Sequence, residues 1–482
     1  MTRYNLQKPD PGATQPPASD LFSDATELER RLGPVEALSI VVGRIIGSGI
    51  FRTPAPIMAA VGCVSLFYGV WVLAGLATIM GAFCYAELVA MMPRSGGPYA
   101  YLKAAYPPLW TFLRGWAMFF VSETGAIAAV ALVFAEYANA AYEIVTGARY
   151  SHITEVAIAL TVIWLLTTIN LFGVYVSGLV QNFFGLLKVI ALGAVIAVGF
   201  SKAGDLANFT APFWPDNVGW STMLSFGIAM RYGFFAYSGW EGATYMAEEV
   251  RDPRRNLPRS LMLGISGVML LYLAANTAYL YQLPVERIST ANWVAVDAMQ
   301  MAIGTAGGVL VSLAVMMNTF GNVSTQILCK ARTWHAMARD GLFIGPIGKI
   351  HPKYKTPNRA LILQGVWASV LLIVAGFAAS AYEVIIDFFS FTSSVFNVST
   401  FAAVWVLRRK YPDALRPFKT PGYPVTLIVV LAIYVWFMIV TLITAPIPSL
   451  LGVLLTSTGL IYYYRAAIAS WFRGSPPSAR SD

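Results

Sequence analysis

The chain has 482 residues, of which 57% are hydrophobic and only 12% are Asp, Glu, Lys or Arg, whereas roughly 25% of the residues of a soluble domain are charged. So few charges cannot cover the surface of a water-soluble protein of this length. The net charge of +9 does not indicate a nucleic-acid-binding protein, because the basic residues lie beside long apolar stretches. The composition predicts an all-α integral membrane protein.

Residues 1–34 precede the first apolar stretch and are rich in Pro, Ser, Asp and Glu. They lack the apolar segment of a cleavable signal peptide. We therefore expect a disordered cytoplasmic tail at this end of the chain, and a short cytoplasmic tail at residues 472–482.

Apolar stretches long enough to cross a bilayer as a helix, about 20 residues, follow one another along the rest of the chain. Glycine, proline and charge clusters divide them into about twelve predicted spans. The spans are 35–59, 64–90, 110–140, 153–173, 178–201, 219–247, 258–283, 303–328, 359–377, 383–407, 425–444 and 447–471. An even number of spans places both termini on the same side of the membrane.

Lysine and arginine are distributed unevenly between the two sides of the membrane. The predicted loops opposite the termini contain only Arg149, Lys202 and Arg287, whereas most of the other basic residues lie on the side of the termini. Because loops rich in Lys and Arg stay in the cytoplasm, both termini are predicted to be cytoplasmic.

The first and sixth predicted spans are each interrupted by a cluster of glycines. The first reads LSIVVGRIIGSGIFRTP and the sixth reads FGIAMRYGFFAYSGWEGATYMAEEV. Two broken helices in corresponding positions of two five-span halves are typical of transporters built from inverted repeats. A break frees amide groups and carbonyl groups that can bind a carboxylate and an ammonium. The pattern therefore predicts a site for a zwitterionic ligand, with close helix packing through small residues as the alternative.

Several motifs along the chain are similar to those of one transporter superfamily. They are GSGIFRTP at 47–54, PRSGGPYAYLKAAYP at 93–107, VQNFFGLLKVIAL at 180–192, GFFAYSGW at 233–240, EEVRDPRRNLPRSL at 248–261, KARTWHAMARDGLF at 330–343 and KYKTPNRAL at 353–361. On these motifs the chain is identified as a member of the amino acid, polyamine and organocation superfamily. It resembles the L-type amino acid transporter branch from residue 33 to about residue 472.

The resemblance implies a leucine-transporter-type 5+5 inverted repeat followed by two extra helices, working by alternating access. The transport core is then expected at 35–407, with repeats at about 35–201 and 219–407, and the two accessory helices in 425–471.

The resemblance also implies where the substrate binds. The α-carboxylate would lie against the backbone of residues 47–49, and the α-ammonium against carbonyl groups of both breaks. The residues implied to form this site are Ile46, Gly47, Ser48, Gly49, Phe235, Ala236, Tyr237, Ser238 and Glu241. Phe235 is implied to be the extracellular gate, although packing against lipid or a neighbouring helix would also account for it.

Lys188 lies near the middle of the apolar fifth span. An ammonium at membrane depth costs about 3 kcal/mol unless it finds acceptors, which the freed carbonyl groups of the first break can supply. In related carriers a lysine at this place occupies the site of a sodium ion, which implies sodium-independent transport here. A lysine that snorkels to the membrane interface is the alternative.

Arg44, Glu123, Arg231 and Glu241 add charge where the related branch generally carries uncharged residues. These residues either bind an unusual substrate side chain or couple transport to protons. Alternatively, Arg44 or Arg231 neutralises Glu123 in a buried pair without a role in transport. If Glu241 faces the side-chain pocket, we expect a preference for cationic or polar amino acids. Arg114 is interpreted as a residue that snorkels at the entrance of the third span.

Metal, cofactor and nucleotide chemistry find no support in the sequence. The three cysteines are scattered without metal-ligand spacing, and the three histidines have no acidic or cysteine companion at ligand spacing. The sequence contains neither a Walker motif nor a set of nucleophile, base and orienting residue. We expect no metal, no cofactor, no ATP-driven step and no enzyme.

The sequence thus predicts a sodium-independent secondary transporter of L-amino acids, either an exchanger or a proton-coupled carrier. The alternatives are a carrier of polyamines, amines or amino acid derivatives, and a membrane amino acid sensor that does not transport. In eukaryotic relatives a cysteine between the third and fourth spans bonds to a heavy chain, and residues 141–153 contain none. We therefore expect no disulfide-linked heavy chain, and a bacterial inner (plasma) membrane protein.

Overall fold

The computed structural model describes residues 30–465 except 31, 95, 173, 211, 340, 355, 379 and 380, and it does not describe the side chains of 174–186, 336 and 339. Nearly all of the predicted N-terminal tail and the whole predicted C-terminal tail therefore lie outside the described residues.

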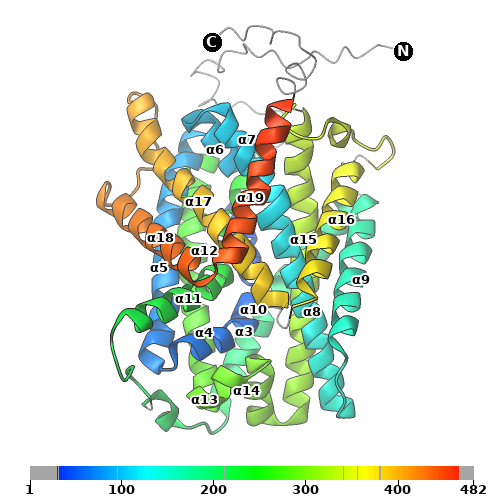
Figure 1. The fold of residues 1–482 in the computed structure, drawn as a ribbon, viewed down its shortest axis with the longest axis vertical. Helices are drawn as coiled ribbons and strands as arrows, with labels where there is room; N and C mark the ends of the chain where they lie inside the picture. Colours follow the sequence, from blue (N-terminus) through cyan, green and yellow to red (C-terminus); the bar gives the residue numbers. More distant parts are fainter. Residues whose placement is uncertain are drawn as a thin grey trace.

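The described part of the chain is helical apart from one isolated bridge between Leu32 and Val250. In chain order (Figure 1), the helices are α2 (Pro34–Ile45), α3 (Gly49–Arg52), α4 (Pro54–Val61), α5 (Val64–Met91), α6 (Pro98–Ala105), α7 (Pro108–Ala117), the π-helix η1 (Met118–Ser122), α8 (Glu123–Thr146), α9 (His152–Leu171), α10 (Val174–Ser201), η2 (Leu206–Phe209), α11 (Trp220–Ala236), the 3-10 helix η3 (Trp240–Glu249), α12 (Pro253–Gln282), α13 (Val285–Thr290), α14 (Val294–Ile303), α15 (Thr305–Arg339), η4 (Gly345–Gly348), α16 (Asn358–Ala375), α17 (Ala381–Lys410), α18 (Val425–Thr444) and α19 (Pro446–Tyr463).

Ten helical segments of the described chain are long and apolar enough to cross a membrane. The 28-residue α10 and the interrupted pair α11 and η3 supply two further passes. Together they account for the about twelve predicted spans. The predicted all-α membrane fold is therefore confirmed.

Proline and glycine set many of the helix ends. Proline stands at the start of six of these helices, where its missing N–H is not needed and its fixed φ suits a helix. These helices are α2, α4, α6, α7, α12 and α19. Gly62 and Gly147 end α4 and α8 in the left-handed conformation that glycine adopts without strain.

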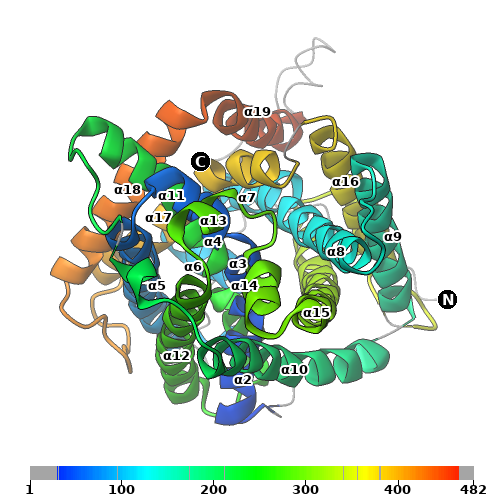
Figure 2. The same cartoon turned by 90° about the horizontal axis from the view of Figure 1, so that it is seen from below.

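The third membrane pass lies at the centre of the molecule. In the most apolar window of α7 to α8, 78% of the residues are buried, compared with 17% in α19. Figure 2 shows α9, α16, α18 and α19 at the outer edge and α3 near the middle. The inner passes therefore enclose the polar residues, while the outer helices present apolar side chains to the surroundings.

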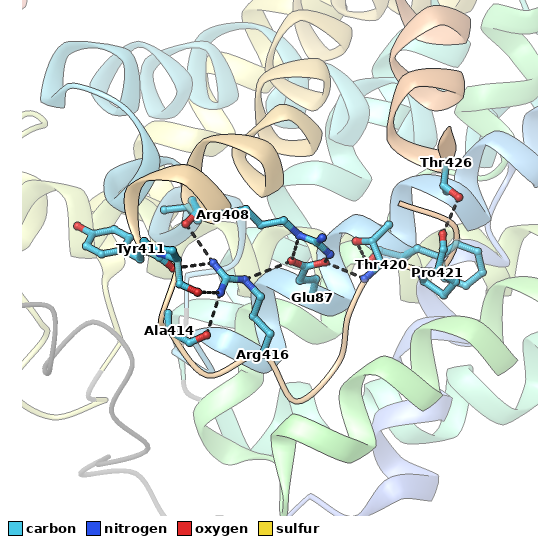
Figure 3. Close-up of polar contacts among 11 residues, drawn as sticks. Glu87, Arg408, Tyr411, Ala414, Arg416, Thr420, Pro421 and Thr426 are labelled. Atoms are coloured by element: carbon cyan, nitrogen blue, oxygen red, sulfur yellow. Dashed lines mark hydrogen bonds and ion pairs between the residues drawn. The ribbon is translucent and has the colours of Figure 1, made fainter. Parts of the chain in front are cut away.

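A charged cluster joins α5 to the end of α17 and to the segment that follows it (Figure 3). The carboxylate of Glu87 is fully buried and accepts hydrogen bonds from Arg408 Nε at 2.8 Å and Nη2 at 2.7 Å. It also accepts one from the backbone N–H of Thr420 at 2.7 Å, and Arg416 Nε lies 3.7 Å away. We call these four residues the Glu87 cluster, and it lies on the predicted cytoplasmic side.

Candidate functional site

The first helix break lies between α2 and α3. Helix α2 ends at Ile45, and Ile46 takes an extended conformation with ψ of 94°, so residues 46–48 leave the helix before α3 begins at Gly49. The break exposes carbonyl groups to side-chain donors from other passes. Tyr272 on α12 donates its hydroxyl to the Ile45 carbonyl oxygen over 2.8 Å.

The second break lies between α11 and η3. Helix α11 ends at Ala236, and Tyr237 to Gly239 form a turn before η3 begins at Trp240. Gly239 has a φ of 93°, and a Cβ atom there would lie 2.9 Å from the Arg44 carbonyl oxygen. This position therefore needs glycine both for its conformation and for the close approach of α2.

The two breaks face each other. A Cβ atom on Gly49 would lie 2.5 Å from the Ala236 Cα atom, so the two backbones touch. The Tyr272 hydroxyl also lies 3.1 Å from the Ala236 carbonyl oxygen and thus bridges both breaks. The sequence pattern correctly predicted both interruptions.

A cavity opens beside the two breaks and extends between α8, α15, α17 and α18. Most of the predicted site residues line it: Arg44, Gly47, Ser48, Gly49, Glu123, Arg231, Phe235, Ala236, Ser238 and Glu241. Ile46, Tyr237 and Lys188 do not line it. Tyr237 is fully buried and turns its hydroxyl toward the Trp71 carbonyl oxygen, 3.2 Å away.

Lys188 lies behind the first break rather than in the cavity. Its side chain is 5% exposed, and its ammonium donates to the Gly43 carbonyl oxygen over 3.1 Å. The snorkelling alternative is therefore wrong, because the ammonium points into the protein and meets the carbonyl acceptor that the sequence predicted.

The buried charges pair differently from the alternative considered on sequence. Arg231 forms an ion pair with Asp387, and Glu123 forms one with Lys330 at 2.5 Å. Neither arginine is thus the direct partner of Glu123. Lys330 lies just beyond the predicted span 303–328, but α15 continues to Arg339 and buries this side chain to 1% exposure.

Arg114 belongs to the cavity, although the sequence indicated a snorkelling residue. It is 5% exposed and lines the cavity, with its guanidinium carbon 5.5 Å from the centre of the Phe396 ring. Among the described residues, none accepts a hydrogen bond from its buried Nε or Nη1. A buried donor without an acceptor is costly, so this side chain is available to a ligand.

The π-helix η1 explains why sequence periodicity did not find Arg114. Arg114 and Glu123 are nine residues apart, about two and a half turns of an α-helix, which would place them on opposite faces. The wider turn at Met118–Ser122 changes this relation, and Arg114, Ser122 and Glu123 all line the cavity. Such π-turns occur frequently at functional sites.

Four ionisable side chains that line the cavity lie near the buried Lys330. We call these five residues the charged floor: Arg44, Arg114, Glu123, Glu241 and Lys330. Glu123 interacts electrostatically with Lys330, Arg114 and Arg44, and Arg44 interacts with Glu241. Three cationic and two acidic groups leave one excess positive charge. The floor therefore favours a ligand that brings acceptor groups or negative charge.

Phe235 lies beside the cavity at the end of α11. It is 8% exposed, and its ring centre lies 5.8 Å from that of Tyr382 and 5.9 Å from that of Phe389. Packing against lipid is therefore excluded in this conformation. The aromatic neighbours on α17 agree both with a gate and with ordinary helix packing.

Comparison with known proteins identifies the family. The amino acid permease family matches residues 32–470. The mouse b(0,+)-type amino acid transporter 1 is 30% identical over 447 residues, which cover 91% of this chain and 88% of the relative. The human large neutral amino acids transporter small subunit 2 is 30% identical over 96% of this chain and 85% of its own. The serine/threonine exchanger SteT of Bacillus subtilis (strain 168) is 30% identical over 92% of this chain and 98% of its own. The chain therefore belongs to the amino acid permease family.

Proposed function

We propose that this multi-pass membrane transporter carries L-amino acids by alternating access, as an exchanger or a proton-coupled carrier that does not need sodium. The two facing helix breaks beside a polar cavity carry this proposal. The named substrates of the relatives, which are amino acids, support it. An enzyme is excluded because the family consists of transporters.

The α-carboxylate of the substrate would bind the backbone amides of residues 47–49. For the α-ammonium, the acceptor capacity of each carbonyl group matters. Phe235 O already accepts hydrogen bonds from the hydroxyl and the N–H of Ser238, at 2.7 and 3.0 Å, so both of its lone pairs are used. We propose that the ammonium instead binds the carbonyl oxygen of Ala236, which lines the cavity, together with a carbonyl group of the first break.

The charged floor distinguishes amino acids from polyamines, which were the alternative substrates. A polyamine would bring two or more positive charges toward a region that already has an excess positive charge. A zwitterion with an acceptor on its side chain would instead accept a hydrogen bond from Arg114 Nε or Nη1, which have no acceptor among the described residues. We therefore propose that four charged residues contact the substrate side chain and determine the selectivity: Arg44, Arg114, Glu123 and Glu241.

The proposal also includes the orientation of the transporter in the membrane, its location, its partners and its division into repeats. The distribution of basic residues supports cytoplasmic termini. We propose a bacterial inner membrane as the location. The lack of cysteine in 141–153 supports function without a disulfide-linked heavy chain. The core at 35–407 would consist of the repeats at about 35–201 and 219–407, with accessory helices in 425–471.

Reconstitution into liposomes tests the proposal. We expect uptake of at least one labelled L-amino acid from a panel, and competition by related amino acids but not by putrescine or spermidine. Protein-free liposomes measure leakage, and liposomes loaded with unlabelled substrate report exchange. Saturable uptake of polyamines without any amino acid uptake would contradict the proposal.

A further inference from the structure

A groove on the predicted cytoplasmic side lies between the start of α12 and the segment after α17. Its walls are formed by Asp252, Arg254, Arg255, Pro258, Arg259, Met262, Leu263, Pro417 and Phe418. None of these residues belongs to the transport cavity. The groove therefore needs an explanation separate from the substrate site.

One part of the lining of the groove is strongly basic. Three guanidinium groups face one carboxylate, that of Asp252. Arg255 and Arg259 are exposed and stand four residues apart, so they point from the same face of α12. Within the described part of the chain, neither of these two arginines forms an ion pair with a carboxylate. Two positive charges without a carboxylate partner among the described residues thus line the groove.

The rest of the lining is apolar, and exposed apolar side chains continue from it along a membrane-spanning helix. Leu263 is 65% exposed and Leu270 is 68% exposed, and both lie on α12, which crosses the membrane. Pro417 and Phe418 form the opposite wall. Arg259 lies four residues before Leu263, about 6 Å along the helix, which matches the depth of one headgroup layer above the hydrocarbon core.

We propose that this groove binds one anionic phospholipid, with its phosphate group between Arg255 and Arg259 and an acyl chain along Leu263 and Leu270. The paired guanidinium groups complement a phosphodiester. The apolar side chains fit a lipid rather than a free phosphate ion, because a phosphate ion would make no contact with them. Basic pockets beside the cytoplasmic ends of membrane helices are suited to anionic headgroups.

The lipid would connect two parts of the molecule. Helix α12 follows directly from η3, the outgoing arm of the second break, and the opposite wall belongs to the segment that the Glu87 cluster holds. A bound lipid would therefore stabilise the contact between them. Binding does not depend on the identity of the transported substrate.

The test measures lipid binding to the delipidated, full-length protein in detergent by native mass spectrometry and thermal unfolding. We expect phosphatidylglycerol to form adducts and to raise the apparent melting temperature, whereas phosphatidylcholine and inorganic phosphate do neither. The double variant Arg255→Gln/Arg259→Gln should bind phosphatidylglycerol about thirtyfold more weakly, since each Lys or Arg near an anionic lipid contributes about a factor of five.

The matched control is Lys349→Gln/Arg359→Gln, which removes two exposed charges on the same predicted side but outside the groove. It should bind phosphatidylglycerol as the wild-type protein does. The charge-retaining variant Arg255→Lys/Arg259→Lys should recover most of the binding. Equal weakening in the control double variant, unchanged binding in the arginine variant, or an equal effect of inorganic phosphate would each overturn the proposal.

Discussion

Lys188 brings an ammonium into the protein interior, where it donates to the Gly43 carbonyl oxygen two residues before the end of α2. This contact joins α10 to the arm of the first break. A cation at this place compensates the carbonyl groups that point toward the break. We therefore propose that Lys188 holds the segment of the first break in shape.

We predict that Lys188→Ala leaves the protein folded but lowers transport by about tenfold or more, because a hydrogen bond of a charged donor contributes about 1.5–3 kcal/mol. Uptake into liposomes and the size-exclusion profile are measured together. Lys202→Ala, which removes an exposed lysine just beyond the same helix, is the control. Wild-type uptake in Lys188→Ala would contradict this role of Lys188.

Arg114 provides a prediction about selectivity. Arg114→Gln should raise the KM for amino acids with a carboxylate or amide side chain more than that for small apolar ones, because only the former need the guanidinium. Competition assays with both classes measure the ratio. Arg359→Gln changes an exposed arginine and should leave the ratio unchanged. An equal loss for both classes would mean that Arg114 only supports the fold.

Variants of Phe235 test whether its ring is the extracellular gate. If the ring closes over the substrate, Phe235→Ala should depress uptake strongly, whereas Phe235→Tyr and Phe235→Trp should retain part of it. Binding, measured by scintillation proximity, should change less than uptake, since occlusion follows capture. Phe235→Leu is the decisive variant, because it keeps apolar packing against Tyr382 and Phe389 but lacks a ring. Wild-type uptake and affinity in Phe235→Leu would refute the gate.

Among single residues, the sequence identified charged side chains within apolar spans, such as Lys188 and Arg231. It predicted the carbonyl acceptors of Lys188, but it did not identify the partners of Arg231 and Glu123. Asp387 and Lys330 lie far from Arg231 and Glu123 in the sequence, so only the packing of α17 and α15 reveals the pairs. Arg114 and Lys330 stood close to predicted span ends, where an error of a few residues changes a loop residue into a buried one.

Among the helices, the two breaks were predictable because glycine clusters interrupt otherwise apolar spans. The π-helix η1 was not, since the sequence MFFVS contains no glycine or proline to mark it. Its position depends on contacts of the folded protein. Thr124, for example, donates its hydroxyl to the Phe119 carbonyl oxygen five residues earlier, at 2.6 Å.

The Glu87 cluster carries a prediction about these helices. Its carboxylate links α5 to α17 and to Thr420, and it has no exposure to solvent. Glu87→Gln should lower the stability by about 3 kcal/mol or more, because it leaves Arg408 and Arg416 without a counter-charge. The apparent melting temperature in detergent measures this effect.

Glu286→Gln changes a carboxylate at an exposed position on α13 and serves as the control for Glu87→Gln. It should leave the melting temperature close to the wild-type value. If Glu87→Gln melts at the wild-type temperature as well, the cluster does not stabilise the folded state.

For the whole molecule, the number and order of passes followed from hydrophobicity, because a bilayer requires long apolar helices. The cavity and the basic groove did not follow, since each is formed by helices that are distant in sequence. Figure 2 shows the short α3 near the middle of the molecule, with α2, α10, α12 and α15 on one side of it. We propose that the position of Lys188 within this arrangement makes transport independent of sodium.

Replacing sodium by choline should leave uptake unchanged. In a sodium-coupled carrier the ion completes the first break, and here the Lys188 ammonium, bonded to Gly43 O at 3.1 Å, already supplies a positive charge there. A second cation beside it would be repelled and would have to shed its water. Uptake into liposomes is therefore measured in sodium and in choline at equal ionic strength, with and without substrate inside. Acceleration by internal substrate would identify an exchanger, whereas acceleration by an inward proton gradient would identify proton coupling. A steep dependence of uptake on sodium would contradict the role given to Lys188.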